Sequence, residues 1–130
     1  MGTSIGKKVG YSVRFDEKVS NETKIKYVTD GMLLRESILD RKLQKYSVII
    51  LDEVHERSLN SDTILALAKD LIINKHRNDL KLIVMSATLS VDKFSSYLNT
   101  NNAIFIDGRS YPIEIYNTLI PHKSYLVNID

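Results

Sequence analysis

The chain is 130 residues long, with 43% hydrophobic and 26% charged residues, and its 18 basic and 16 acidic side chains leave a net charge of +2. This length permits one domain at most, large enough for a hydrophobic core, and the proportions are those of an ordinary globular protein. The absence of cysteine excludes disulfides and thiolate metal sites. No apolar run approaches the roughly 20 residues of a membrane span, and so small a net charge gives no support by itself for a nucleic-acid partner.

The amino-terminal part of the chain predicts two strands followed by a helix. Residues 9–15 alternate apolar and polar side chains, as a half-exposed strand does, and residues 16–23 are polar and turn-like. Residues 25–28 predict a second short strand. Asp30 then follows as a candidate N-cap for a helix over residues 32–39.

The next strand carries the most informative residues. Residues 48–51 are an unbroken apolar run rich in β-branched side chains, which predicts a strand covered on both faces. Asp52 and Glu53 follow at its end. In open α/β sheets ligands lie beyond the carboxyl ends of the strands, and NTPases place a magnesium-binding acid there. The alternative is a strand that ends in an exposed acidic turn.

The rest of the chain continues the alternation of helices and strands. Asn60 or Ser61 is a candidate cap for a second helix, whose apolar residues recur at helical spacing: Ile64, Leu67, Ala68, Leu71 and Ile72. A charged break over residues 75–79 precedes a buried strand over residues 82–85. Ser90 is a candidate cap for a short helix with Phe94, Tyr97 and Leu98 on one side. Residues 103–106 predict a further strand, and residues 112–119 an extended segment.

Strands that alternate with helices predict an α/β fold, in three layers, with a mostly parallel sheet flanked by helices. A phosphate-binding loop is absent from the sequence. The pair Gly6-Lys7 is followed by Lys8 where the loop needs Ser or Thr, and Met1 stands where its first glycine should be.

Several stretches resemble one family, in that family's order: VGYSVRF, TDGMLLRE, YSVIILDEVHERSL, LKLIVMSATL and GRSYPIEIY. LDEVHER is similar to motif II of the DEAH-box RNA helicases, with Val54 at a position where that family usually has Ala. The resemblance implies an ATP-dependent RNA helicase. It also implies a RecA-like fold of the P-loop NTPase class without its opening P-loop unit. Residues 1–107 would be part of the first RecA-like domain, and residues 108–130 an exit segment towards a second one.

The same resemblance implies roles for the residues at two strand ends. Asp52 would hold Mg²⁺, through a bound water, beside the phosphates of ATP, and Glu53 would orient and deprotonate the attacking water. His55 would help to couple the nucleotide site to the other domain, although a lone histidine is often structural. Glu56 and Arg57 are expected to form a local ion pair. The triplet of Ser86, Ala87 and Thr88 resembles motif III, which links ATP hydrolysis to strand separation; otherwise it is a turn capped by hydroxyls.

A second group of residues resembles the family's RNA contacts. Thr29, Asp30 and Gly31 match a motif that touches the RNA backbone at the start of a helix, where unpaired amides suit phosphate. Because phosphate would repel a carboxylate, we assign Asp30 to capping and keep Thr29 and Gly31 as contacts. Arg14 lies where the family carries a backbone-contacting hook, although it could be an ordinary exposed arginine. Contacts of this kind are independent of base sequence.

Two functional hypotheses follow. The first is part of a helicase that uses ATP and Mg²⁺ to unwind RNA or remodel ribonucleoprotein, with an activating protein partner and a nuclear or nucleolar location, and with the isolated chain inactive. The second is a non-catalytic RNA- or protein-binding module derived from such a domain. A DNA helicase is a third reading, because the 2′-hydroxyl contacts that distinguish RNA from DNA cannot be located from sequence. It is the weaker reading, because the resemblance is to RNA helicases.

Overall fold

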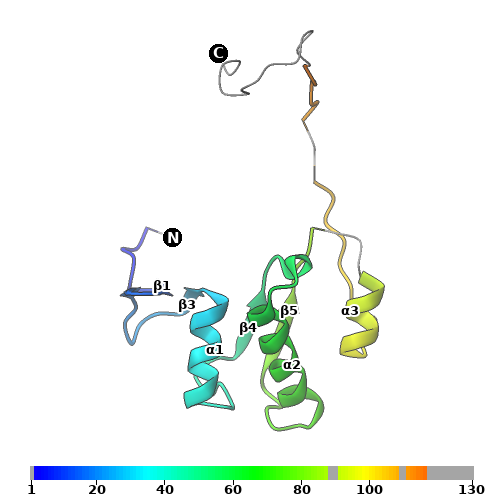
Figure 1. Cartoon of the computed structure of the whole chain (residues 1–130). Coiled ribbons are helices and arrows are strands. Elements are labelled where there is room, and N and C mark those ends of the chain that lie inside the picture. Colours follow the sequence, from blue (N-terminus) through cyan, green and yellow to red (C-terminus); the bar gives the residue numbers. More distant parts are fainter. Residues whose placement is uncertain (1, 88–90, 109–110, 117–130) are drawn as a thin grey trace, which may run out of the picture.

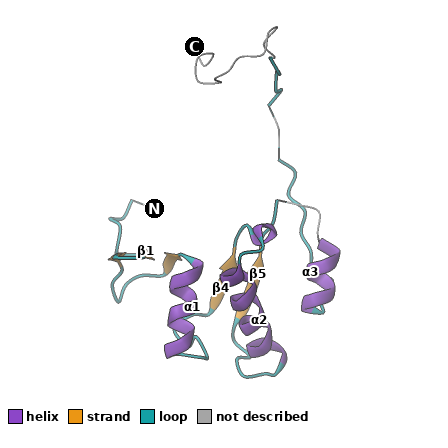
Figure 2. Cartoon of the chain, in the orientation of Figure 1, coloured by secondary structure: helices purple, strands orange, loops and turns teal. Residues whose placement is uncertain are grey.

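The computed structural model describes residues 2–87, 91–108 and 111–116. After three strands at the amino-terminal end, helices and strands alternate along this part of the chain, as Figures 1 and 2 show. In order the elements are β1 (Val9–Val13), β2 (Asp16–Lys18), β3 (Ile25–Val28), α1 (Asp30–Leu39), β4 (Val48–Leu51), the 3₁₀ helix η1 (Val54–Glu56), α2 (Leu59–Ile73), β5 (Lys81–Val84) and α3 (Val91–Leu98). The predicted α/β class is therefore confirmed.

The described strands form two small sheets. In the first sheet the strand order is β2-β1-β3, with β1 and β3 parallel and β2 antiparallel to β1. In the second sheet β4 and β5 are parallel neighbours. Each parallel pair has a carboxyl edge at which the residues after both strands meet, and all the predicted site residues follow one of these four strands.

The hydrophobic core lies between β4 and the two longer helices. Ile49 and Leu51 of β4 pack in one cluster with Leu33 of α1 and with Ile64 and Leu71 of α2, and Ile64 is fully buried. The two helices contact each other and stand side by side in Figure 1. Fully burying one such aliphatic side chain contributes about 1.5–3 kcal/mol. This cluster therefore holds the strand that carries the two acids.

The prediction that β4 is covered on both faces was wrong for the described residues. Ile49 and Leu51 face the core, whereas Val48 and Ile50 are 46% and 56% exposed. The strand after α2 behaves in the same way: Leu82 and Val84 pack against the core, and Ile83 on the opposite side is 46% exposed. An apolar run indicates that a strand can be buried on both faces, but each face is buried only where another element packs against it.

The segment after β1, residues 16–23, was expected to be a polar turn, but its first residues form a hairpin with β1. Residues 16–18 form β2, and Val13 pairs with Asp16 across a turn of two residues. Phe15 in that turn has a φ of 68°, which is unusual for a residue with a side chain. Gly10 makes the close strand pairing feasible, because a Cβ atom there would lie 2.4 Å from the Lys18 carbonyl oxygen. The sequence prediction failed here because short polar strands lack an apolar pattern.

Two of the three predicted helix caps differ from the observed ones. Thr29 is the N-cap residue of α1, and Asp30 is the first residue inside that helix. Ser58 is the N-cap of α2, and its Oγ accepts a hydrogen bond from the Ser61 backbone N–H at 3.0 Å. Ser58 thus satisfies an otherwise unpaired amide of the first turn, which is the physical reason for a hydroxyl at that position. The candidate cap Ser90 lies outside the described residues.

The predicted strand at residues 103–106 was wrong. These residues have no regular secondary structure, and Ile104 and Ile106 are 89% and 90% exposed. In Figure 1 this segment runs away from the helices and sheets. A strand is stabilised by hydrogen bonds to a neighbouring strand, and none of the described strands lies beside it. Residues 112–116 also lack regular structure and are exposed, and residues 117–119 lie outside the described part.

None of the helices in the described ranges is long and apolar enough to cross a membrane.

Candidate functional site

The carboxyl ends of β4 and β5 meet at one edge. Leu51 pairs with Val84, so Asp52 follows one strand beside Met85 on the other. Two backbone hydrogen bonds connect the loops beyond: the Met85 N–H donates to the Leu51 carbonyl at 2.8 Å, and the Val54 N–H donates to the Met85 carbonyl at 3.2 Å. The acidic loop is therefore tied to the residue that immediately precedes Ser86. The structure brings together the predicted nucleotide residues and the first residues of the predicted coupling triplet.

The backbone after β4 turns so that both carboxylates face solvent. Asp52 and Glu53 are exposed, and Glu53 has a φ of 52°, in the left-handed region. That conformation costs a residue with a side chain roughly 1–2 kcal/mol. The Asp52 Oδ1 accepts a hydrogen bond from the Glu53 N–H at 2.9 Å, and Val54, the next residue, is only 2% exposed. A buried anchor and a side-chain bond thus stabilise a turn that presents two acids.

His55 lies beside the second of these acids. Its Nδ1 is 3.3 Å from a Glu53 carboxylate oxygen, but the two groups are not aligned as a hydrogen bond. Nδ1 is buried and has no hydrogen-bond partner within the described ranges. His55 and Glu53 are thus in contact without a hydrogen bond between them.

Arg57 is paired, but its partner is not the predicted one. Instead of Glu56 it contacts Asp62 in the first turn of α2, through Nε at 3.0 and 3.1 Å and Nη2 at 2.9 Å. This two-pronged bond lowers the pKa of the Asp62 carboxyl and raises that of the Arg57 guanidinium. The expected ion pair of Glu56 with Arg57 was therefore wrong, and the helical partner five residues away was missed, because only the folded turn brings it within reach.

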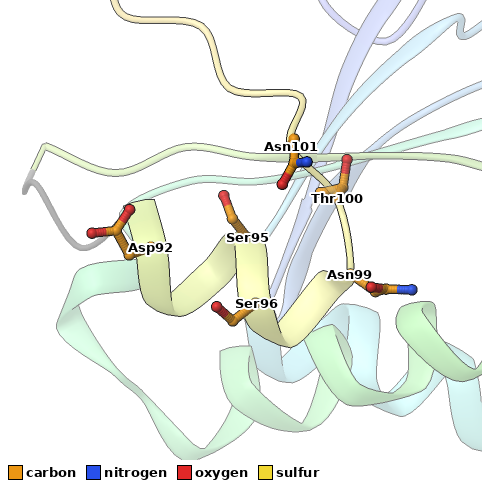
Figure 3. Close-up of a pocket in the computed structure, with 6 residues that line it drawn as sticks. All are labelled: Asp92, Ser95, Ser96, Asn99, Thr100 and Asn101. Atoms are coloured by element: carbon orange, nitrogen blue, oxygen red, sulfur yellow. The ribbon is translucent and has the colours of Figure 1, made fainter.

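Two hollows lie near α3. A cavity of about 650 Å³ has His55, Arg57 and Asp62 on one side and Lys93, Phe94 and Tyr97 of α3 on the other. A second hollow, of about 310 Å³, is lined by Asp92, Ser95, Ser96, Asn99, Thr100 and Asn101 (Figure 3). Its lining comes entirely from α3 and the residues directly after it. The second hollow therefore shares no residue with the acidic loop, whereas the first one adjoins it.

The other carboxyl edge carries the predicted RNA contacts. Ser12 of β1 pairs with Val28 of β3, so that Arg14 and Thr29 follow neighbouring parallel strands. Both side chains are exposed, and the Thr29 hydroxyl makes no capping hydrogen bond. The Arg14 guanidinium carbon lies 4.8 Å from the centre of the Phe15 ring, which is 93% exposed. The structure thus groups the predicted contacts on one accessible edge.

A polar contact that sequence reasoning missed joins α1 to α2. Asp30 Oδ2 accepts hydrogen bonds from the Ser58 hydroxyl at 3.0 Å and from the Ser61 hydroxyl at 2.6 Å. These residues are far apart in the sequence and carry no joint motif, so only the folded arrangement shows the contact. Gly31, the next predicted RNA residue, has space around it, since a Cβ atom there would meet only the Asn60 side chain at 3.5 Å.

Comparison with known proteins decides the family. The DEAD/DEAH box helicase family matches residues 3–96. The chain belongs to this helicase family. It is 47% identical over 129 residues to the ATP-dependent RNA helicase DHX33 of Homo sapiens, and equally to that of Mus musculus. In each case the match covers 95% of this chain and 18% of the relative, so the chain spans less than a fifth of these relatives.

The helicase match includes every predicted site residue, from Arg14 to Thr88. It confirms the predicted resemblance to the DEAH-box RNA helicases. Of the coupling triplet, Ser86 and Ala87 are exposed beside the acidic loop, and Thr88 lies outside the described residues. The helicase family also implies the RecA-like fold, of which the described parallel pairs and their helices are a part.

Proposed function

We propose that this chain is the part of an ATP-dependent RNA helicase that carries its hydrolytic acids and some of its RNA contacts. The parent protein would couple ATP hydrolysis to the unwinding of RNA or the remodelling of ribonucleoprotein. One observation supports this most directly: the backbone after β4 exposes Asp52 and Glu53 at the carboxyl edge of a parallel pair, in a helicase family. That edge is where α/β proteins bind nucleotides.

Asp52 would hold Mg²⁺ through a bound water, and the metal would neutralise the negative charge of the ATP phosphates during hydrolysis. Within the described ranges, no group of three His, Cys, Asp or Glu side chains could hold a metal ion. Mg²⁺ is usually bound by one or two carboxylates together with phosphates and water, and Asp52 is an exposed carboxylate at this edge. Glu53 would position the attacking water and accept its proton, since its carboxylate is exposed next to Asp52.

His55 and the triplet of Ser86, Ala87 and Thr88 would couple hydrolysis to movement. His55 touches the carboxylate side chain of Glu53 on one side and lines the cavity beside α3 on the other. Ser86 directly follows Met85, which is bonded to both Leu51 and Val54. A displacement of the acidic loop during hydrolysis would therefore reach the triplet through a backbone connection.

Arg14, Thr29 and Gly31 would contact RNA through its phosphates. Arg14 offers a charged donor, Thr29 a hydroxyl without a capping bond, and Gly31 an uncrowded backbone at the start of α1. The first-turn amides of a helix favour negative charge. Phosphate contacts carry no sequence information, so binding would be independent of base sequence.

The isolated chain would be a very poor ATPase. Its sequence holds no phosphate-binding loop, and the arginine finger of such enzymes lies on a second RecA-like domain and is worth about 10³–10⁵ in rate. Residues 1–107 would be part of the first, three-layered RecA-like domain, with residues 108–130 leading towards the second. An activating protein partner and a nuclear or nucleolar location complete the proposal.

The test compares phosphate release from this chain with that from a protein extended to the length of its relatives, in Mg²⁺, ATP and poly-U RNA. We expect turnover and RNA stimulation only in the extended protein. Glu53→Gln should lower its rate by about 10²–10⁴, because a positioned base contributes that much. Glu56→Gln, another exposed acid of the same loop, should leave the rate nearly unchanged.

Near wild-type turnover in Glu53→Gln would remove that residue from the reaction. If the extended protein does not hydrolyse ATP while the short chain binds RNA, the chain is a binding module and the helicase proposal fails.

A further inference from the structure

The candidate nucleotide edge and the candidate RNA edge belong to separate sheets in the described part of the chain. Each edge leads directly into a helix. Thr29 and Gly31 lie on either side of Asp30 at the start of α1, and Ser58 caps the start of α2 directly after the acidic loop and η1. The starts of α1 and α2 are therefore the places where the two edges can influence each other.

A carboxylate connects these two helix starts. Asp30 Oδ2 accepts hydrogen bonds from Ser58 Oγ at 3.0 Å and from Ser61 Oγ at 2.6 Å, both partly buried. Hydrogen bonds to an ionised acceptor are shorter and roughly twice as strong as neutral ones. The contact joins residues separated by 28 and 31 positions in the chain.

This contact does more than cap a helix. The α2 amide that needs a partner is already satisfied, since Ser58 Oγ accepts from the Ser61 N–H at 3.0 Å. Among the described residues, both side-chain hydrogen bonds of Asp30 go to α2 and neither goes to its own helix. The carboxylate thus links two elements, and its two neighbours in the sequence, Thr29 and Gly31, are the candidate RNA contacts.

We propose that Asp30 is a positioning residue that couples RNA binding at the β1–β3 edge to ATP hydrolysis at the β4–β5 edge. The inference rests on the function proposed above. A nucleotide-dependent movement of the acidic loop displaces the Ser58 cap, because only η1 and Arg57 separate them. Hydrogen bonds of 2.6 and 3.0 Å transmit this displacement to Asp30 or break, and either result changes the backbone that carries Thr29 and Gly31.

Three substitutions isolate the contact. Asp30→Ala removes the acceptor of both hydrogen bonds. Ser61→Ala removes the shorter bond and keeps the α2 cap, because the cap uses the Ser61 backbone N–H. Asp30→Asn keeps an acceptor oxygen and should therefore retain part of the coupling that Asp30→Ala loses. Thr63→Ala is the matched control: it removes a hydroxyl from the same helix, and among the described residues that hydroxyl bonds to the Leu59 carbonyl of its own helix.

The measurement is ATP hydrolysis by the extended protein with and without poly-U RNA. We expect Asp30→Ala and Ser61→Ala to keep the RNA-free rate close to that of wild type, because neither residue belongs to the candidate reacting groups. Their stimulation by RNA should fall at least about fivefold, the lower end of usual coupling between sites. Asp30→Asn should lose less, and Thr63→Ala should behave as wild type.

A binding measurement adds a readout that a merely structural role would not change. Coupling is reciprocal, so the factor by which a non-hydrolysable ATP analogue raises RNA affinity should shrink in the same variants, by the same factor as the effect of RNA on analogue affinity.

Unchanged RNA stimulation in both Asp30→Ala and Ser61→Ala would overturn the inference. So would a parallel loss of RNA-free rate, RNA stimulation and thermal midpoint, which would show that the contact only stabilises the fold. A wild-type extended protein that hydrolyses ATP without responding to RNA would instead overturn the proposed function, so that the two failures are distinguishable.

Discussion

Arg77 is the residue whose loss should most clearly reveal how the segments before β4 and β5 are held together. It lies in the charged connection after α2, yet it is only 8% exposed. Its guanidinium donates to the carbonyls of Lys42 at 2.7 Å, Leu43 at 2.9 Å and Tyr46 at 2.7 Å. It also forms a two-pronged bond to Asp79, at 2.8 and 2.7 Å. Arg77 therefore joins the turn before β4 to the connection before β5.

The magnitude follows from what each carbonyl would lose in an Arg77→Met variant, which keeps the apolar stem and removes the donors. Water can replace the donor at the partly buried Lys42 and Tyr46 carbonyls, so we assign about 1 kcal/mol to each. The hydrogen bond to Leu43 is buried, and an unsatisfied carbonyl there costs about 2 kcal/mol. The expected total of about 4 kcal/mol is a large fraction of the 5–15 kcal/mol typical of folded proteins.

Urea unfolding followed by circular dichroism measures this loss. With a denaturant dependence of about 2 kcal/mol/M, the midpoint should fall by about 2 M. Asp79→Asn is the matched control, since it breaks only the ion pair with a 66% exposed carboxylate, and exposed pairs contribute little. An Arg77→Met midpoint no lower than that of Asp79→Asn would refute the reasoning, because it would show that the carbonyl contacts do not hold the turn.

The same pair makes a pH prediction. The guanidinium of Arg77 holds the pKa of Asp79 at about 2, below the usual value of about 4. A lowered carboxyl pKa stabilises the fold above the unfolded value and loses that effect as the pH falls from about 4 towards about 2. The decline of unfolding free energy across this range should therefore be shallower in Arg77→Met than in wild type.

Three further predictions concern other parts of the chain. Arg14→Glu should weaken RNA binding by the extended protein and reduce its salt slope by about 1; an unchanged slope would exclude a phosphate contact. Ser86→Ala combined with Thr88→Ala should keep RNA-stimulated ATP hydrolysis and abolish unwinding, and intact unwinding would contradict the coupling role. Burial and then the hydrogen bond to Glu36 raise the pKa of Tyr46, so stability should decline above pH of about 10, and more steeply in wild type than in Tyr46→Phe.

The local sequence pattern predicted helices and strands correctly where tertiary packing favours the same structure. The alternation at residues 9–15 and the apolar run at residues 48–51 correspond to β1 and β4, and the helical spacing from Ile64 to Ile72 corresponds to α2. It failed where a distant element decides the outcome. Residues 103–106 are as apolar as a strand, but no described strand lies beside them to accept their hydrogen bonds.

The candidate site was predictable to the same extent. Asp52 and Glu53 stand in a motif and follow an apolar run, so the sequence shows them. In the sequence Arg77 is one of several charged residues in a polar connection. Its hydrogen-bond partners are backbone carbonyls of the turn at residues 40–46, which only the folded chain brings beside it. The contact of Asp30 with Ser58 was missed for a related reason, since 28 residues separate the pair and the helices α1 and α2 must pack first.

The buried Val54 explains how the acidic loop can be stable while it exposes two acids. The left-handed backbone of Glu53 and Arg57 costs about 1–2 kcal/mol each, and both residues are exposed, so neither offsets that cost by burial. Val54 between them is 2% exposed and is bonded through its N–H to Met85, and burying a valine contributes about 1.5–3 kcal/mol. The bidentate bond from Arg57 to Asp62 fixes the far end of the same turn. The loop can therefore keep two carboxylates in solvent because much of its stability comes from the residues beside them, and both acids remain exposed to a ligand.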